Sequence, residues 1–311
     1  MKKLLLLLGL CLTSVFNYSQ IANQPTSFDL CDDETQDGVT AFDLTLKDAE
    51  ILGNQNPNDF IVSYHLTPGE ANANLNALAS PFVNFINPQT LYVRVEEIIS
   101  GNFDSTTLII RVLPNPVAGV PNVLEVCDDD NDGFSTFDLT INEAIILNGE
   151  SGNTISYFLS ESDAIANTNL IANPTAFANT TPNFQTIYVR LENATTGCFS
   201  IVDFNIIVNV LNINAQAFDV ISCESSNGFG VFDLTINETQ ILNGISNLEV
   251  SYFESLNDAY SGLNQITQPN TYFNTQAYNQ TIYMRIVDLS TGCIFVRDLL
   301  VLYLATEELI I

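Results

Sequence analysis

The sequence QTIYVRLEN, residues 185–193, alternates between apolar and polar side chains. Ile187, Val189 and Leu191 fall on one face of an extended chain, and polar or amphipathic residues fall on the other, which is typical of a half-buried β-strand. A second β-rich run, FSIVDFNIIVNV, begins at Phe199. These two runs predict the long strands of a β-sheet.

The same text recurs on both sides of this stretch, as QTLYVRVEE from Gln89 and QTIYMRIVD from Gln280. A second block recurs with it, as AFDLTLKDAEILG, TFDLTINEAIILNG and VFDLTINETQILNG. Cys31, Cys127 and Cys223 keep the same interval of 96 residues (127 − 31 and 223 − 127). A unit of this length suits an independent domain and is too long for one turn of a solenoid.

We therefore predict an all-β protein with three tandem immunoglobulin-like units, each an antiparallel β-sandwich with one short capped helix. In the second unit, Thr140 and Glu143 have the spacing of a capping box at the start of that helix. The segment from Ser160 could add a second helical turn. The expected domains are residues 21–117, 118–213 and 214–311.

Residues 1–20 have a basic start and a short apolar run, the pattern of a secretory signal peptide. No later segment is apolar enough for a transmembrane helix. The formal net charge of −28 disfavours binding to nucleic acid or anionic lipid. The sequence thus predicts an extracellular or cell-surface protein in a compartment where disulfides persist.

Five cysteines follow the predicted signal peptide. The most economical pairing stays within a unit, and joins Cys127 to Cys198 and Cys223 to Cys293. Cys31 is then unpaired, either as a buried thiol or as a site for an intermolecular bond.

The acidic stretch CDDDNDGF contains the D-x-D-x-D-G spacing that begins many calcium loops. The bidentate glutamate of an EF-hand is missing, and a solvated acidic turn is the alternative. The first unit has a weaker version of the stretch, and the third unit retains little of it. The predicted calcium ligands are Asp128, Asp130, Asp132, the Phe134 carbonyl and Asp138, with a weaker site at Asp32, Glu34 and Asp37.

Arg94, Arg190 and Arg285 occupy the same position in the three units. Anion capture is possible there, but a structural role in bidentate pairs with carboxylates is favoured. The predicted partners are Asp43, Asp138 and Asp233, respectively. The single histidine, His65, is expected to replace a packed or surface aromatic residue, since Phe158 and Phe253 match it in the other units. No catalytic motif recurs, so an enzyme is not expected.

The combination CDDDNDGFSTFDLT, ILNG, ISYF and NFQTIYVRLENATTGC resembles the immunoglobulin-like repeats of surface and gliding-associated proteins of the Bacteroidota, flavobacteria among them. The resemblance covers nearly all of residues 21–311. It implies export by the type IX system and a role in adhesive or spacer stalks. The C-terminal sorting domain of such proteins is not seen, so a fragment of a longer gene product and a short secreted form both stay open.

The function expected from these observations is a structural spacer or adhesin segment at the cell surface, stiffened by calcium. The alternative is a calcium-dependent module that binds a glycan or a protein. That alternative predicts an exposed aromatic patch near the acidic loop of one unit, whereas a spacer predicts equivalent surfaces in all three.

Overall fold

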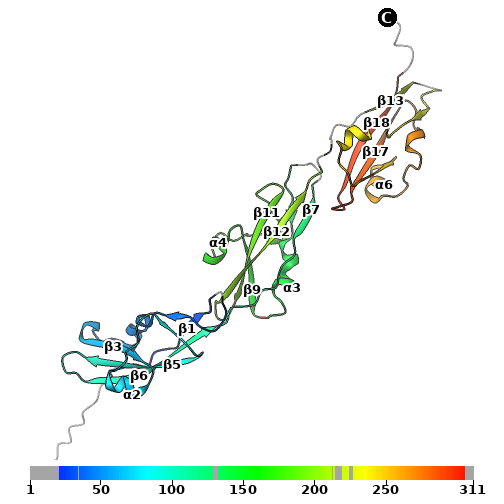
Figure 1. Cartoon of the computed structure of the whole chain (residues 1–311). Helices are drawn as coiled ribbons and strands as arrows, with labels where there is room; N and C mark the ends of the chain where they lie inside the picture. The colour runs from blue at the N-terminus through cyan, green and yellow to red at the C-terminus, as the bar shows by residue number, and fades with distance from the viewer. Residues whose placement is uncertain are drawn as a thin grey trace, which may run out of the picture. The chain divides into compact units, whose positions relative to one another are not determined.

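A computed structural model describes residues 21–33, 35–128, 132–211, 213, 219–223 and 227–304. The chain forms three similar repeats in the order expected from the sequence (Figure 1). The predicted signal peptide, Glu34 and Asp130 lie outside the described residues. No helix within these ranges is long and apolar enough to cross a membrane.

Repeat 1 has a four-stranded sheet with the order β1–β6–β5–β3 and a two-stranded sheet formed by β2 and β4. Strands β3, β5 and β6 pair antiparallel, whereas β1 pairs parallel with β6. The elements are β1 (Phe28–Cys31), β2 (Ala41–Phe42), η1 (Leu44–Lys47), α1 (Asp48–Leu52), η2 (Pro57–Asp59), β3 (Phe60–His65), α2 (Pro68–Ala73), β4 (Phe82–Val83), β5 (Gln89–Glu97) and β6 (Phe103–Leu113).

Repeat 2 has the same arrangement, with the strand order β7–β12–β11–β9 and a two-stranded sheet of β8 and β10. In Figure 1, helices α3 and α4 lie on different sides of its long strands. The elements are β7 (Leu124–Cys127), β8 (Thr136–Phe137), η3 (Leu139–Asn142), α3 (Glu143–Ile146), β9 (Asn153–Phe158), α4 (Glu161–Ala166), η4 (Pro174–Ala176), β10 (Phe177–Ala178), β11 (Phe184–Asn193) and β12 (Phe199–Asn209).

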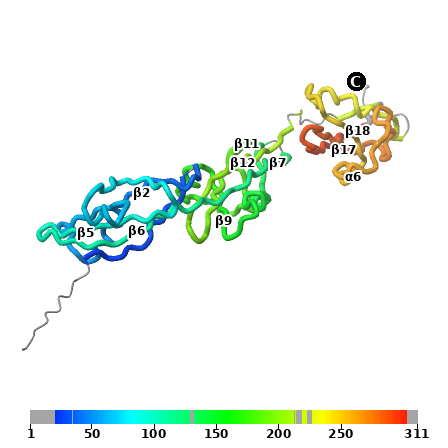
Figure 2. Tube along the Cα trace, turned by 60° about the horizontal axis from the view of Figure 1, so that its bottom comes forward, coloured from blue at the N-terminus to red at the C-terminus, as the bar shows by residue number. Residues whose placement is uncertain are grey.

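Repeat 3 repeats this order again, as β13–β18–β17–β15 with a sheet of β14 and β16. Figure 2 shows α6 beside its long strands β17 and β18. The elements are β13 (Val220–Cys223), β14 (Val231–Phe232), α5 (Glu238–Leu242), β15 (Leu248–Phe253), α6 (Leu256–Ser261), η5 (Pro269–Thr271), β16 (Tyr272–Phe273), β17 (Asn279–Asp288) and β18 (Ile294–Leu304).

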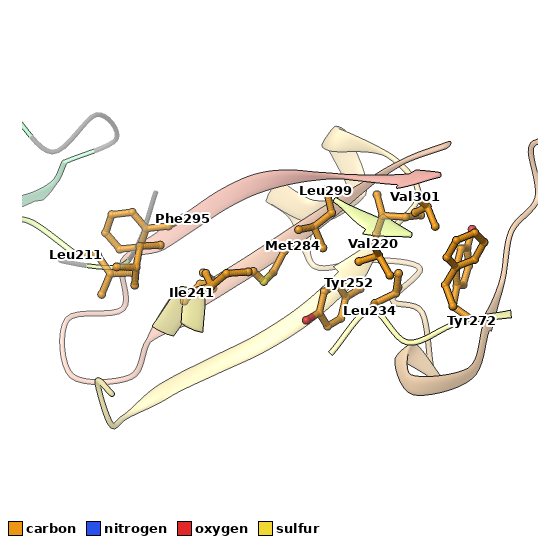
Figure 3. Close-up of a cluster of buried hydrophobic side chains, with 14 of the residues drawn as sticks. Leu211, Val220, Leu234, Ile241, Tyr252, Tyr272, Met284, Phe295, Leu299 and Val301 are labelled. Atoms are coloured by element: carbon orange, nitrogen blue, oxygen red, sulfur yellow. The ribbon is translucent and has the colours of Figure 1, made fainter. Parts of the chain in front are cut away.

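Each repeat has its own core between the four-stranded sheet and the layer that contains the two-stranded sheet and the first helix. The side chains of Ile187, Val189 and Leu191 are fully buried, which confirms the alternation expected from the sequence. In repeat 3 the core extends from Leu211 and Phe295 at one end to Tyr272 at the other (Figure 3). These separate cores confirm the three immunoglobulin-like units.

In the part that the structure describes, each repeat contains two short α-helices, where one was predicted. The second helix of repeat 2, α4, begins after Ser160, whose hydroxyl accepts a hydrogen bond from the Asp163 amide. It ends at Asn167 in the left-handed conformation. Such caps allow a six-residue helix to satisfy its terminal backbone groups. The second helical turn that the sequence suggested after Ser160 is therefore a separate short helix.

Candidate functional site

Among the residues that the structure describes, two disulfides join neighbouring repeats. Cys31 of repeat 1 is bonded to Cys198 of repeat 2, with a Cα–Cα distance of 5.4 Å. Cys127 of repeat 2 is bonded to Cys293 of repeat 3, with a Cα–Cα distance of 5.5 Å. The sequence separations of the two pairs are 167 and 166 residues. Both bonds therefore use the same two positions of the repeat, one from each neighbour.

The first position is the C-terminal end of the first strand. Cys31 ends β1 opposite Leu113, the last residue of β6. Cys127 ends β7 opposite Asn209, the last residue of β12. Because these strand pairs are parallel, the cysteine lies where its repeat's final strand ends and the chain leaves for the next repeat.

The second position is a tight turn before the final strand. The Asn193 side chain accepts hydrogen bonds from the amides of Thr195 and Thr196, and the Gly197 amide bonds to the Asn193 carbonyl at 2.8 Å. The Thr196 hydroxyl then accepts from the amide of Cys198, whose side chain is fully buried. The turn at Asp288–Cys293 has equivalent bonds, which makes the T-G-C sequence a preformed site for the second cysteine.

The predicted pairing within a repeat is wrong. Cys127 is opposite the end of β12, whereas Cys198 precedes the start of β12. A strand of 11 residues spans about 36 Å, and a disulfide requires Cα atoms about 4.4–6.8 Å apart. Cys127 and Cys198 therefore lie at opposite ends of their own repeat. The predicted Cys223–Cys293 pair is also replaced, because Cys293 is bonded to Cys127.

The prediction that Cys31 is unpaired is also wrong, because Cys31 is bonded to a cysteine of repeat 2. Repeat 1 has a similar turn before β6, in which the Glu97 amide bonds to the Asn102 carbonyl. Asn102 occupies the place of Cys198 there. The repeats thus bond in one direction, from the first cysteine of one repeat to the second cysteine of the next. Cys223 ends β13 at the same position as Cys31 and Cys127.

The acidic loops are held by their own backbone amides. The side chain of Asp128 is buried, and its Oδ2 accepts a hydrogen bond of 2.7 Å from the Gly133 amide. Asp132 accepts from the Phe134 amide in the same turn. Gly133 has φ +81°, and a Cβ there would lie 2.8 Å from the Pro182 side chain. The first aspartate and the glycine of the stretch are therefore required to close the loop.

The other described carboxylates that were predicted as calcium ligands accept hydrogen bonds of their own. Asp138 is exposed and accepts from the amide of Thr140, at the N-terminus of η3. In repeat 1, Asp32 accepts from Gly38, and Asp37 accepts from Val39. Within the described ranges, no three His, Cys, Asp or Glu residues form a group that could hold a metal ion. Calcium binding stays a prediction that depends on Asp130.

A buried asparagine directly after β4, β10 or β16 holds the acidic loop of each repeat through hydrogen bonds. This role of the asparagine was not predicted from the sequence. Asn179 accepts from the Ser135 amide at 2.7 Å, and its side-chain amide donates to the carbonyls of Gly133 and Thr181. Asn84 and Asn274 make the equivalent bonds in the other repeats. The recurrence of this asparagine five or six residues before the QT block was the available signal.

The predicted pairs between the repeated arginines and the FDLT aspartates are wrong. Arg94 forms a salt bridge of 2.7 Å with Glu96 and stacks on Phe103, with Cζ 3.4 Å from the ring centroid. Its Nη1 also donates to carbonyls at the end of α2. The Nη1 of Arg190 likewise donates to carbonyls at the end of α4. The salt-bridge partner of Arg94 is thus Glu96 and not Asp43.

Those aspartates cap the first helical turn, and the predicted capping box is absent. Asp43, Asp138 and Asp233 each accept from the threonine two residues later. The acid of each predicted capping box accepts instead from a buried tyrosine hydroxyl. Glu238, for example, accepts a hydrogen bond of 2.8 Å from Tyr252. Burial and this acid raise the pKa of Tyr252 above its ordinary value, so the phenol stays protonated.

His65 is fully buried, as a packed replacement for the aromatic residue. Its Nδ1 is 2.8 Å from the Leu75 carbonyl oxygen, and its Nε2 is 2.9 Å from the Ser63 hydroxyl oxygen. Both ring nitrogens are thus engaged inside repeat 1, which gives this histidine a structural role.

These features define a class of protein, a tandem immunoglobulin-like array with a disulfide between each repeat and the next. The chain belongs to the family described as the Flavobacterium inter-domain disulphide bond domain, which matches residues 27–116, 122–212 and 219–305. This match confirms the resemblance to flavobacterial immunoglobulin-like repeats. No curated protein matches the sequence.

Several solved structures resemble the fold. The I-band fragment I67–I69 from titin is 8% identical, with 91% of this chain and 97% of that chain covered and a TM-score of 0.29. Extracellular domains 3–5 of Drosophila OTK are 9% identical, with 92% and 96% covered and a TM-score of 0.25. BT4661, a SusE-like surface-located polysaccharide-binding protein of Bacteroides thetaiotaomicron, is 9% identical, with 89% and 59% covered and a TM-score of 0.27.

Proposed function

We propose that this protein is an extracellular spacer or adhesin segment whose repeats are linked so that it carries load at a cell surface. The observation that supports this is the pair of disulfides between successive repeats. Disulfides persist in oxidising compartments, which fits an exported protein. Export by the type IX system is part of the proposal, because the sequence resembles repeats of proteins that are exported in this way.

Each junction between repeats has two covalent connections. From repeat 1 to repeat 2, one is the backbone after Leu113, and the other is the Cys31–Cys198 bond. They leave repeat 1 from adjacent strand ends, because Cys31 is opposite Leu113 in the register. A tensile load is therefore shared, and a single break in the linker does not separate the repeats.

The second connection passes the load into a strand that is already extended. Cys198 is followed directly by β12, which ends at Asn209 before the segment that leads to repeat 3. An extended strand has almost no further length to release. A pull between Cys198 and the end of β12 therefore does not gain extension by unfolding the rest of repeat 2.

Cleavage of the first linker tests whether the repeats remain joined. A specific protease site inserted at Val120, which is 85% exposed, should be cut without separating the fragments in a non-reducing gel. Reduction should then release them. The matched variant Cys31→Ser should separate on cleavage without a reductant. Separation of the oxidised parent protein after cleavage would contradict the proposal.

Calcium stiffening is a further part of the proposal, carried by Asp128, Asp130 and Asp132. Asp128 and Asp132 each accept an amide hydrogen bond in the loop, and a carboxylate offers about four lone-pair sites, so both retain acceptor capacity for a cation. For a Kd of about 0.5 mM, 5 mM calcium would add roughly 1.4 kcal/mol and raise the melting temperature of one repeat by about 5–10 °C.

Thermal melts in calcium and in EGTA check this prediction. Asp130→Asn should abolish the shift, because it removes the ligand on which the site depends, whereas Asp203→Asn, on an exposed residue of β12, should leave it intact. Identical melts of the parent protein in calcium and EGTA would make the loop an acidic turn without a bound ion.

A further inference from the structure

Repeat 3 has a cavity of about 560 Å³ on its surface, next to β16. One wall comes from Glu254, directly after β15, and from Asp258 on α6. The loop 264–268 and Thr271 form another wall, and Phe273 lines the mouth with 58% of its surface exposed. All of these residues belong to repeat 3, so the cavity is complete within one repeat.

The framework of this region is the same in repeat 2. The Asn264 side chain donates to Asp258 at 2.8 Å, as Asn169 does to Asp163. The Ile266 amide bonds to the Tyr252 carbonyl at 2.8 Å, and the Ile171 amide bonds to the Tyr157 carbonyl at the same distance. Repeat 2 is therefore an internal reference, in which each lining residue of repeat 3 has a known counterpart.

The residues on this framework differ in two ways. Four alkyl positions and one phenylalanine of repeat 2 carry hydrogen-bonding side chains in repeat 3, and one further alkyl position carries an aromatic ring. Relative to repeat 2, the lining has Glu254 for Leu159, Gln265 for Leu170, Thr267 for Ala172, Thr271 for Ala176, Tyr272 for Phe177 and Phe273 for Ala178. Six such replacements around one cavity, on an unchanged framework, indicate a surface adapted to a polar ligand.

The two acids of the cavity are held in place. Glu254 accepts hydrogen bonds from the hydroxyls of Tyr272 at 3.1 Å and Thr275 at 3.0 Å. Asp258 accepts from Ser255 at 2.6 Å and from Asn264 at 2.8 Å. Burial and Glu254 raise the pKa of Tyr272 to about 12, so this phenol stays a donor at neutral pH. The carboxylates are thus oriented before a ligand arrives, at the end of the core shown by Tyr272 in Figure 3.

The remaining polar groups are available to a ligand. Gln265, Thr267, Gln268 and Thr271 are exposed, and in the described part of the chain their side chains make no hydrogen bond. Amides and hydroxyls of this kind both donate and accept, as a polyhydroxylated ligand requires.

The aromatic wall provides the apolar part of the cavity. The rings of Phe273 and Phe229 are nearly parallel, at 7°, with centroids 6.3 Å apart. Repeat 2 has Ala178 in place of Phe273, so it lacks this stacked pair. An exposed, supported ring offers a flat apolar face to the C–H groups on one side of a sugar ring.

We propose that this cavity of repeat 3 binds an uncharged carbohydrate, with a pyranose on Phe273 and its hydroxyls on Glu254, Asp258 and the Gln and Thr side chains. The two fixed carboxylates and the net charge of −28 exclude sulfated and uronate polymers by repulsion. This binding would act in addition to the load-bearing role and does not depend on it.

Affinity electrophoresis of residues 21–311 tests the proposal, in gels that contain laminarin, xyloglucan, galactomannan or starch. Gels with alginate or dextran sulfate provide the anionic comparison. We expect retardation in at least one neutral gel and none in the anionic gels. Retardation in no neutral gel, or in the anionic gels alone, overturns the proposal.

Variants that restore the side chains of repeat 2 locate the site. Phe273→Ala and Gln265→Leu should each reduce the retardation at least fivefold, whereas Phe184→Ala, which removes a 51% exposed ring from repeat 2, should not change it. Melting curves identify any variant that fails to fold, and Gln265→Leu keeps the test valid if Phe273→Ala is one. Unchanged retardation in both folded variants overturns the assignment to this cavity.

Discussion

Pulled from its two ends, the oxidised protein should extend to about one third of the length that the reduced protein reaches. The two disulfides close loops with separations of 167 and 166 residues that overlap between Cys127 and Cys198. The shortest covalent path from residue 21 to residue 304 passes through both bonds and contains about 92 residues, or roughly 320 Å when extended. The reduced stretch of about 283 residues reaches roughly 1,000 Å.

Single-molecule force spectroscopy with and without a reductant measures this difference. Cys31→Ser or Cys127→Ser alone should give an intermediate length of about 410 Å, because one loop opens and the other stays closed. The double variant should behave like the reduced protein. If oxidised and reduced chains unfold to the same length, the disulfides do not limit extension and the load-bearing proposal fails.

Replacement of Asn179 by alanine should destabilise repeat 2 by about 3 kcal/mol. Asn179 is buried and makes two hydrogen bonds to the loop that contains Gly133 and Ser135, and a third to the Thr181 carbonyl. Its loss leaves buried backbone groups without partners, at roughly 1–3 kcal/mol for each group. For a domain of this size, the expected fall in melting temperature is about 12–24 °C.

Hydrogen exchange measured by mass spectrometry can follow repeat 2 apart from its neighbours. Protection should be lost across β8, β10 and the acidic loop in Asn179→Ala. The exposed residue Asn173 serves as the control, because Asn173→Ala should change stability by no more than about 0.5 kcal/mol. Unchanged protection in Asn179→Ala would show that the loop is held mainly by Asp128 and Gly133.

The fold was predictable because the sequence contains three copies of the same pattern. The alternation at Ile187, Val189 and Leu191 identifies the central strand, and the 96-residue interval defines the units. The direction of the first strand was not predictable in this way. A strand that ends in Cys127 has the same pattern whether it pairs parallel or antiparallel with β12, and only the parallel pairing separates Cys127 from Cys198.

The candidate sites were harder to predict from the sequence for a related reason. Carboxylates in a short acidic motif suit a cation, a helix cap and a closed turn equally well, and tertiary hydrogen bonds select among these roles. Asp138 caps a helix, and Asp128 closes a turn on Gly133. The cavity of repeat 3 was visible only after the fold aligned Phe273 with Ala178, because no single lining residue forms a motif.

The order of the cysteines along the chain has a consequence for biosynthesis. Each native bond skips at least one cysteine, since Cys31 passes over Cys127, and Cys127 passes over Cys198 and Cys223. An oxidase that joined cysteines in their order of emergence from a translocation channel would trap the wrong isomer. The repeats must therefore fold before they are oxidised, or a disulfide isomerase must correct them, and the yield of native protein will depend on that timing.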